Sequence, residues 1–334
     1  MTSKRKMLGH SRLRFAVAWT ILLLCLLVSQ KISYHALAPP PAPPAPRIPV
    51  PPPAVPHPIE PDEVLVMIMS GASTARERLP AMRAVFDEFA LAPGVAVVIE
   101  ADPGPDIVPP TWTVLETPHC GDGQTGALCC KTAFAMGSAL RLMPQLKWVL
   151  RVCDDTYVHM SNVIPYLEHF DPDQPWYLGE KYVGQHAPTP YADGGAGWAL
   201  SRGALHMLAP RLSEFYSGQQ PCYDDVRFGE FMHATLGVPL FQASGFHNEP
   251  VTVPSLWLDV FHSFHAEHGG RNVTTRPITF HTRMGAQAGD AAAGRGDVDV
   301  QWLLALKRAV DRASAVLPVF GDADLPALQK RVKK

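Results

Sequence analysis

The stretch Leu146-Lys-Trp-Val-Leu-Arg-Val-Cys-Asp-Asp155 decides the fold, because it joins a mainly apolar run, with Lys147 and Arg151 inside it, to a pair of acids. A mainly apolar run of this length is typical of a buried strand. We therefore predict a strand over 146–152 that ends at Asp154 and Asp155. Carboxylates at the end of a buried strand are costly unless they bind something, and hard oxygen ligands suit Mg²⁺ or Mn²⁺. The same Asp-Asp-Thr sequence is also common as a simple turn with a helix cap.

Predicted strands and helices alternate on both sides of this stretch. Strands are expected over 64–69, 95–100, 112–116, 176–179 and 276–281, and helices over 77–91, 127–142, 161–170, 201–216, 224–235 and 300–317. Ser161 and Ser201 are expected to act as helix N-caps. The alternation predicts an α/β fold with a doubly wound, mainly parallel, Rossmann-like sheet. Ligands bind at the carboxyl ends of the strands in such sheets, where Asp154 and Asp155 fall.

The first 61 residues predict a membrane anchor followed by a spacer. A basic tail over 1–12 precedes an apolar run, so residues 13–30 are expected to form a signal-anchor transmembrane helix with the tail in the cytosol. A cleaved signal peptide is the alternative, because Ala36-Leu-Ala38 resembles a cleavage site. Residues 31–61 form a proline-rich stem, in which proline favours an extended polyproline II spacer. Residues 62–334 then form one lumenal domain of a single-pass type II membrane protein.

Charge and cysteine content narrow the class of protein further. The formal net charge of the 334 residues is -2, so no basic excess points to a nucleic-acid partner. Cys25 lies in the apolar run, and no Cys/His pattern has the spacing of a zinc site. In an oxidising lumen one or two disulfides are plausible among the remaining five cysteines, with at least one thiol left over. Those five are Cys120, Cys129, Cys130, Cys153 and Cys222.

Three further sets of residues are candidates for ligand binding or catalysis, and each also has a purely structural explanation. The segment Gly194-Gly-Ala-Gly197 lets backbone approach a ligand closely, or is only a tight turn before a strand. Asp224 and Asp225 start a predicted helix, where a carboxylate either takes a proton from a hydroxyl or simply caps the helix. His262 and His281 are candidate metal ligands, although a lone histidine is more often packing or surface.

The order of these groups resembles the Fringe-like glycosyltransferases of glycosyltransferase family 31, which include Fringe and the core 1 β1,3-galactosyltransferases. The resemblance covers about residues 63 to 283, and the glycine and Asp-Asp-Thr-Tyr-Val blocks are its most specific parts. The matching motifs are Leu128-Cys-Cys-Lys-Thr-Ala, Trp148-Val-Leu-Arg-Val-Cys-Asp-Asp-Thr-Tyr-Val, Tyr177-Leu-Gly, Gly194-Gly-Ala-Gly-Trp-Ala-Leu-Ser-Arg, Asp224-Asp-Val-Arg-Phe-Gly and Phe261-His-Ser-Phe.

The resemblance implies a GT-A fold and an inverting β-1,3-type transfer. A hexose or N-acetylhexosamine would move from a UDP-sugar to an acceptor hydroxyl on a glycan or glycoprotein, at the Golgi or ER membrane. Asp155 would be the principal ligand of Mn²⁺ or Mg²⁺, with His281 as the preferred histidine ligand and His262 as the second choice. Asp225 would be the general base, with Asp224 as the alternative.

The remaining implied roles concern the donor. Asp154 would contact it, Gly194 and Gly195 would line its cleft, and the loop from Ser70 to Arg78 would lie near the uridine.

One departure from the family pattern opens a second hypothesis. The family commonly has three acids before Thr/Asn-Tyr-Val, whereas this chain has Cys153 in place of the first. A cysteine does not replace a carboxylate for a hard cation without cost. The alternative is therefore a catalytically silent chaperone or glycan-binding protein. The presence of Asp154, Asp155, Asp225 and His281 together favours the enzyme.

Overall fold

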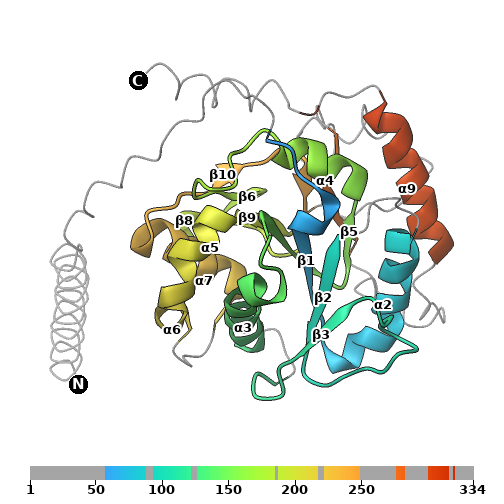
Figure 1. Cartoon of the computed structure of the whole chain (residues 1–334), viewed down its shortest axis with the longest axis horizontal. Helices are drawn as coiled ribbons and strands as arrows, with labels where there is room; N and C mark the ends of the chain where they lie inside the picture. The colour runs from blue at the N-terminus through green and yellow to red at the C-terminus, as the bar shows by residue number, and fades with distance from the viewer. Residues whose placement is uncertain are drawn as a thin grey trace, which may run out of the picture. The chain divides into compact units, whose positions relative to one another are not determined.

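A seven-stranded sheet forms the centre of the computed structural model, with the strand order β10-β6-β9-β4-β1-β2-β3 (Figure 1). The model describes residues 57–87, 93–121, 126–184, 187–216, 222–248, 276–282, 300–315 and 319. All neighbouring strands pair in parallel except β9, which is antiparallel to both β4 and β6, so the predicted mainly parallel sheet is confirmed. The strands are β1 (Val64–Met69), β2 (Gly94–Ile99), β3 (Thr113–Glu116), β4 (Trp148–Cys153), β6 (Tyr177–Gly179), β9 (Trp198–Ser201) and β10 (Phe241–Gln242).

Helices cover both faces of this sheet, which explains why β1 is apolar at every position. Val64, Val66 and Ile68 face one hydrophobic cluster, and the alternate residues Leu65 and Met67 face the other. The first cluster includes α2 (Ala72–Asp87), α4 (Met160–Leu167) and α9 (Val300–Ser314). The second includes α3 (Ala127–Leu142), α5 (Arg202–Leu208), α6 (Leu212–Phe215) and α7 (Asp224–Glu230), on the other side of the sheet in Figure 1.

A second, three-stranded sheet brings the end of the chain to the acids after β4. It consists of β5 (Thr156–Val158), β11 (Phe246–His247) and β12 (Thr279–His281). β12 is antiparallel to β5, and the register pairs His281 with Thr156. His281 therefore lies beside Asp155 although 126 positions separate them in the sequence. A hairpin of β7 (Lys181–Gly184) and β8 (Ala187–Ala192) precedes the glycine segment.

Two helix starts differ from the predictions, and one predicted N-cap is confirmed. α2 begins at Ala72, five residues earlier than predicted, and the Ala72 amide donates to Oε2 of Glu100 at 2.8 Å. α4 follows His159, so the predicted N-cap at Ser161 is wrong. The predicted N-cap at Ser201 is confirmed, because its Oγ accepts from the amide of Ala204 at 3.2 Å.

Two predicted helices are not α-helical over their whole length. The expected helix over 201–216 is interrupted by a 3-10 turn at Ala209–Arg211, where Pro210 cannot donate a backbone hydrogen bond. The expected helix over 224–235 ends in a π-helical turn, Phe231–Thr235.

Residues 1–56, including the predicted tail, the signal anchor and most of the stem, lie outside the described residues. The described chain starts on the domain itself, because the His57 amide donates to the Glu168 carbonyl at 2.8 Å and Ile59 is buried. Within the described part of the chain, no helix has the length and apolar character needed to cross a membrane. The predicted loop over 284–297 is also outside the described residues.

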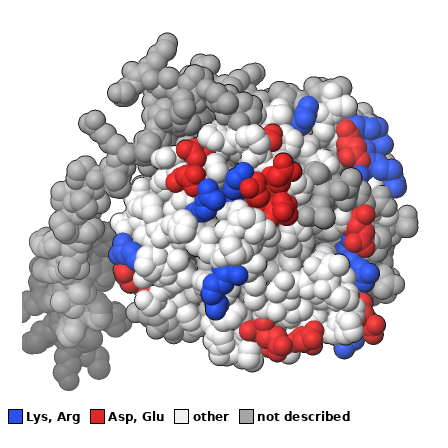
Figure 2. All heavy atoms as spheres, in the orientation of Figure 1, with Lys and Arg blue, Asp and Glu red and all other residues white. Residues whose placement is uncertain are grey.

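Charged side chains on the face shown in Figure 2 occur largely as acidic and basic groups close to one another. Exposed ion pairs of the described residues include Arg211 with Glu214 at 2.7 Å and Arg227 with Glu230 at 3.1 Å. Solvent and salt screen such pairs, so each contributes little to stability. The ion pairs that matter for function are the buried ones described below.

Two disulfides connect elements on the α3 side of the sheet. Cys120 bonds to Cys130, and Cys129 bonds to Cys222, whereas Cys153 is free. The second bond joins α3 to the residues immediately before α7, which are 93 positions away. It therefore fixes the start of the helix that carries the acid pair.

Replacing Cys129 and Cys222 together by Ser is expected to lower the free energy of unfolding by about 2–5 kcal/mol, because the bond closes a long loop. Urea denaturation of the oxidised protein measures the difference. The matched control is Cys153→Ser, which breaks no disulfide. Equal denaturation midpoints for the double variant and the control would contradict the prediction.

Candidate active site

A cavity of about 580 Å³ opens where β1 and β4 end side by side. It is lined by all but one of the candidate residues: Ser70, Arg78, Asp154, Asp155, Gly194, Gly195, Asp224, Asp225 and His281. The exception is His262, which lies outside the described residues. The fold thus brings together candidate residues from five separate parts of the sequence.

The Asp154 carboxylate is buried and receives three hydrogen bonds from the β1–α2 region. Oδ2 accepts from Ser70 Oγ at 2.8 Å and from Thr74 Oγ1 at 2.6 Å, and Oδ1 accepts from Arg78 Nη1 at 2.8 Å. Hydrogen bonds to an ionised carboxylate are stronger than neutral ones. Asp154 therefore fixes the loop from Ser70 to Arg78.

Asp155 is arranged to stay ionised and faces His281. Its Oδ2 accepts from Arg78 Nη1 at 3.2 Å, and its Oδ1 lies 3.5 Å from His281 Nε2. Burial by itself would raise the pKa of this carboxyl, but the interactions with His281 and Arg78 outweigh burial and lower it. Asp155 consequently carries a full negative charge at neutral pH.

A relay of side chains behind His281 sets the orientation of its ring. Asn248 Nδ2 donates to Asp193 Oδ2 at 2.9 Å, so the amide oxygen of Asn248 must face His281 Nδ1, 2.8 Å away. An amide oxygen only accepts, so Nδ1 carries a proton and Nε2 is the ring atom that faces Asp155. An imidazole nitrogen and a carboxylate oxygen 3.5 Å apart are placed as two ligands of one cation would be.

The glycine segment is shaped around this histidine. A Cβ on Gly195 would lie 2.3 Å from His281 Nδ1, so the ring occupies the space of the missing side chain. Asp193 Oδ1 accepts from the Gly195 amide at 2.8 Å, and the same carboxylate orients Asn248. The predicted close approach to the glycine backbone is therefore made by a side chain of this protein, beside the cavity.

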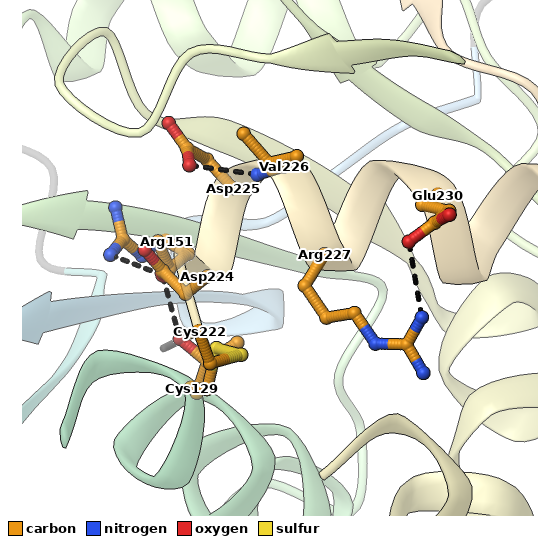
Figure 3. Close-up of a disulfide and its surroundings, with 9 residues drawn as sticks. Cys129, Arg151, Cys222, Asp224, Asp225, Val226, Arg227 and Glu230 are labelled. Atoms are coloured by element: carbon orange, nitrogen blue, oxygen red, sulfur yellow. Dashed lines mark hydrogen bonds and ion pairs between the residues drawn. A yellow bond between two sulfur atoms is a disulfide. The ribbon is translucent and has the colours of Figure 1, made fainter. Parts of the chain in front are cut away.

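The two acids at the start of α7 have different environments, and Figure 3 shows their carboxylates on different sides of the helix. Asp224 is buried, and its Oδ2 accepts from Arg151 Nη2 at 2.7 Å and from Thr132 Oγ1 at 2.9 Å. Both contacts of Asp224 are with buried groups of β4 and α3, so Asp224 has a positioning role in this structure.

Asp225 is only partly buried and has no cationic partner among the described residues. The amides of Gly194 and Val226 donate to it at 3.2 and 2.7 Å. Burial and the charge of Asp224 raise the pKa of Asp225 to about 6. A carboxylate with this pKa can accept a proton near neutral pH, so the geometry favours Asp225 over Asp224 as the base.

Two buried cations support the site and were not among the predicted residues. Arg151 is fully buried, and its Nη1 donates to the Gly194 carbonyl at 2.8 Å. Lys131 forms an ion pair with Glu100 and donates to the Ser70 carbonyl at 2.8 Å. The sequence held a signal for both, because each lies within a motif that carries the family resemblance.

Cys153 contributes no charge to the cavity. Burial raises the pKa of its thiol to about 12 although Arg151 lowers it, and its Sγ lies 3.5 Å from the Gly194 carbonyl oxygen. A neutral thiol is a poor ligand for a hard cation. The pair of Asp155 and His281 does not depend on it, so the structure gives no support to the silent-chaperone alternative.

The chain matches the model of a known protein family and part of the length of several known proteins. Residues 107–284 match the model of the Fringe-like family. The chain is 28% identical over 154 residues to a Fringe glycosyltransferase of Drosophila melanogaster, covering 40% of this chain and 37% of the relative. It is 32% identical over 118 residues to a β-1,3-glucosyltransferase of Mus musculus, covering 34% and 23%. The chain thus spans about a quarter to two fifths of these relatives' length.

A third relative and one solved structure complete the comparison. A Xenopus laevis glycoprotein-N-acetylgalactosamine 3-β-galactosyltransferase 1 is 39% identical over 88 residues, covering 26% of this chain and 24% of the relative. The crystal structure of the galactosyltransferase LgtC, in complex with donor and acceptor sugar analogs, aligns with a TM-score of 0.42 and 12% identity. That alignment covers 78% of this chain and 98% of LgtC.

Proposed function

Because this chain belongs to the Fringe-like family, we propose that it is an inverting β-1,3-type glycosyltransferase with a GT-A domain. It moves a hexose or N-acetylhexosamine from a UDP-sugar to a hydroxyl of a glycan or glycoprotein. One observation carries the proposal: a single cavity contains an ionised carboxylate that faces Nε2 of an imidazole, and a separate carboxylate with a raised pKa. The reaction needs a cation site for the diphosphate and a free base for the acceptor.

The charge of the cavity supports a divalent cation on the donor side. Five carboxylates and three cationic side chains line it, so an approaching diphosphate meets an excess of negative charge. Asp155 Oδ1 and His281 Nε2 would hold Mn²⁺ or Mg²⁺, and the oxygens of the donor would complete its coordination. When bound, the cation neutralises the charge that develops on the UDP leaving group.

Asp225 acts on the acceptor side of the cavity. Its carboxylate takes the proton of the acceptor hydroxyl as that oxygen bonds to the anomeric carbon and the bond from this carbon to the diphosphate breaks. Attack opposite the leaving group inverts the configuration. The amides of Gly194 and Val226 hold the Asp225 carboxylate in place by hydrogen bonds.

The cysteines and the N-terminal sequence support a location in the secretory pathway. Two disulfides are typical of an oxidising compartment. The basic tail and apolar run at the N-terminus suit a type II anchor. We therefore propose that the protein is held in the Golgi or ER membrane with its catalytic domain in the lumen.

Release of UDP tests the proposal. The full-length chain in detergent is assayed with UDP-galactose, UDP-N-acetylglucosamine or UDP-glucose, with Mn²⁺ or EDTA, and with methyl glycosides of hexoses and N-acetylhexosamines as acceptors. We expect release with one donor that needs the cation and is at least about a hundredfold slower in Asp155→Ala, because the charge on the leaving group is no longer neutralised.

The matched control for this experiment is Asp173→Ala. Asp173 also pairs with an arginine, Arg202, but its side chain is 65% exposed and lies outside the cavity lining. Its release rate is expected to equal that of the wild type. Absence of UDP release, together with no calorimetric binding of UDP and Mn²⁺, would overturn the proposed function.

A further inference from the structure

Tyr223 is an exposed aromatic side chain at the cavity that the proposed reaction does not yet use. Among the described residues, the exposed large hydrophobic side chains are those of Tyr182, Val183, Met207 and Tyr223. Tyr223 is the most exposed of them, at 59%, and the one that lines the cavity. A large aromatic group left in water beside a polar cavity is a typical element of a binding site.

The backbone around Tyr223 is fixed on both sides. Cys222 is bonded to Cys129 of α3, and its carbonyl accepts from the Gly126 amide at 2.9 Å. The Tyr223 carbonyl accepts from the Arg227 amide at 2.9 Å, in the first turn of α7. The exposed ring is therefore carried by an ordered backbone. Such preorganisation lowers the entropic cost of binding a ligand.

The position of Tyr223 relative to the proposed base indicates what it binds. Tyr223 precedes Asp224 and Asp225 directly, and both Tyr223 and Asp225 line the cavity. The proposed diphosphate site at Asp155 and His281 comes from other elements, the end of β4 and β12. The Tyr223 ring, two residues from the proposed base Asp225, is therefore in a position to bind the acceptor, whose hydroxyl loses its proton.

We propose that Tyr223 is the platform for the acceptor, and that the apolar C–H face of the acceptor sugar ring stacks on it while a hydroxyl of that sugar reaches Asp225. The inference rests on the proposed glycosyltransferase function and deepens it by naming an acceptor subsite. The class of ligand is a pyranose ring with one face free of axial hydroxyl groups. Tyr223 determines acceptor affinity and does not take part in the bond changes.

Kinetics of Tyr223→Ala test the subsite, with the donor and methyl glycoside that give turnover in the wild type. A methyl glycoside is used because it brings no aromatic ring of its own. We expect the acceptor KM to rise about tenfold, in line with the loss of one stacking contact. The KM for the donor, the Kd of UDP with Mn²⁺ and the slow release of UDP without acceptor should stay at the wild-type values. Tyr223→Phe and Tyr223→Trp should restore the acceptor KM.

Tyr182→Ala is the matched control, because Tyr182 is 47% exposed but does not line the cavity. Its acceptor KM should not change. An unchanged acceptor KM in Tyr223→Ala would overturn the subsite while leaving the transferase intact. Weaker UDP binding in Tyr223→Ala would also overturn it and assign the ring to the donor. A wild-type chain that neither turns over a donor nor binds UDP with Mn²⁺ would remove the proposed function and this inference together.

Discussion

Asp225→Asn is expected to reduce kcat by about 10²–10⁴-fold, the range that general-base catalysis contributes. The asparagine retains the size of the side chain and one acceptor oxygen, but it has no lone pair basic enough to take the proton of the acceptor hydroxyl. The Kd of UDP with Mn²⁺ should stay near the wild-type value, because Asp155 and His281 are untouched. Steady-state kinetics with the donor identified by UDP release measure the change.

The pH dependence gives an independent check on the same residue. Burial and the charge of Asp224 raise the pKa of Asp225 to about 6, and the base acts in its ionised form. In the wild type, kcat/KM should therefore rise with pH up to about 6 and then level off. Asp225→Asn should lose this rise. A profile with the same rise in the variant would assign the titration, and the role of base, to another group.

The raised pKa of Asp225 also predicts that stability falls with pH over the range in which kcat/KM rises. The folded state binds the Asp225 proton more tightly than the unfolded chain, whose carboxyl has the ordinary pKa of 3.8. The contribution of this group to stability is therefore present below pH 3.8 and is lost as the pH rises to about 6. Asn mimics the protonated side chain, so the variant should not share this loss. The ionised form of Asp225, which acts as the base, is therefore the form that stabilises the fold less.

The sequence predicted the sheet well because the relevant signals are local. The apolar runs of β1 and β4 mark buried strands, and the acids that follow β4 mark the ligand edge of the sheet. The family resemblance also assigned Asp225 and His281 to one site. His281 reaches Asp155 through the sheet register, in which β12 pairs with β5 immediately after Asp155.

The sequence did not predict features that depend on contacts between distant residues. Nothing local marks Asn248 as the group that orients His281, since its partners Asp193 and His281 are reached only through the fold. The early start of α2 depends on Glu100, which follows a different strand and accepts from the Ala72 amide. Similarly, the division of roles between Asp224 and Asp225 depends on the buried Arg151.

Arg151→Met is expected to lower the free energy of unfolding by about 3–5 kcal/mol, because it leaves the Asp224 carboxylate buried without its partner. Arg151 is fully buried, so solvent does not screen the pair, and its Nη2 lies 2.7 Å from Asp224 Oδ2. The substitution also removes the bond from Nη1 to the Gly194 carbonyl. Urea denaturation measures the loss.

A double variant separates the charge effect from the packing effect of this substitution. In Arg151→Met with Asp224→Asn no carboxylate is left unpaired, so the two substitutions together should cost less than the sum of the single ones. Arg202→Met is the matched control, because Arg202 pairs with Asp173 at 2.6 Å on the surface and its loss should cost at most about 1 kcal/mol. Equal costs for Arg151→Met and Arg202→Met would contradict the prediction, because breaking the buried pair of Arg151 and Asp224 would then cost no more than breaking an exposed surface pair.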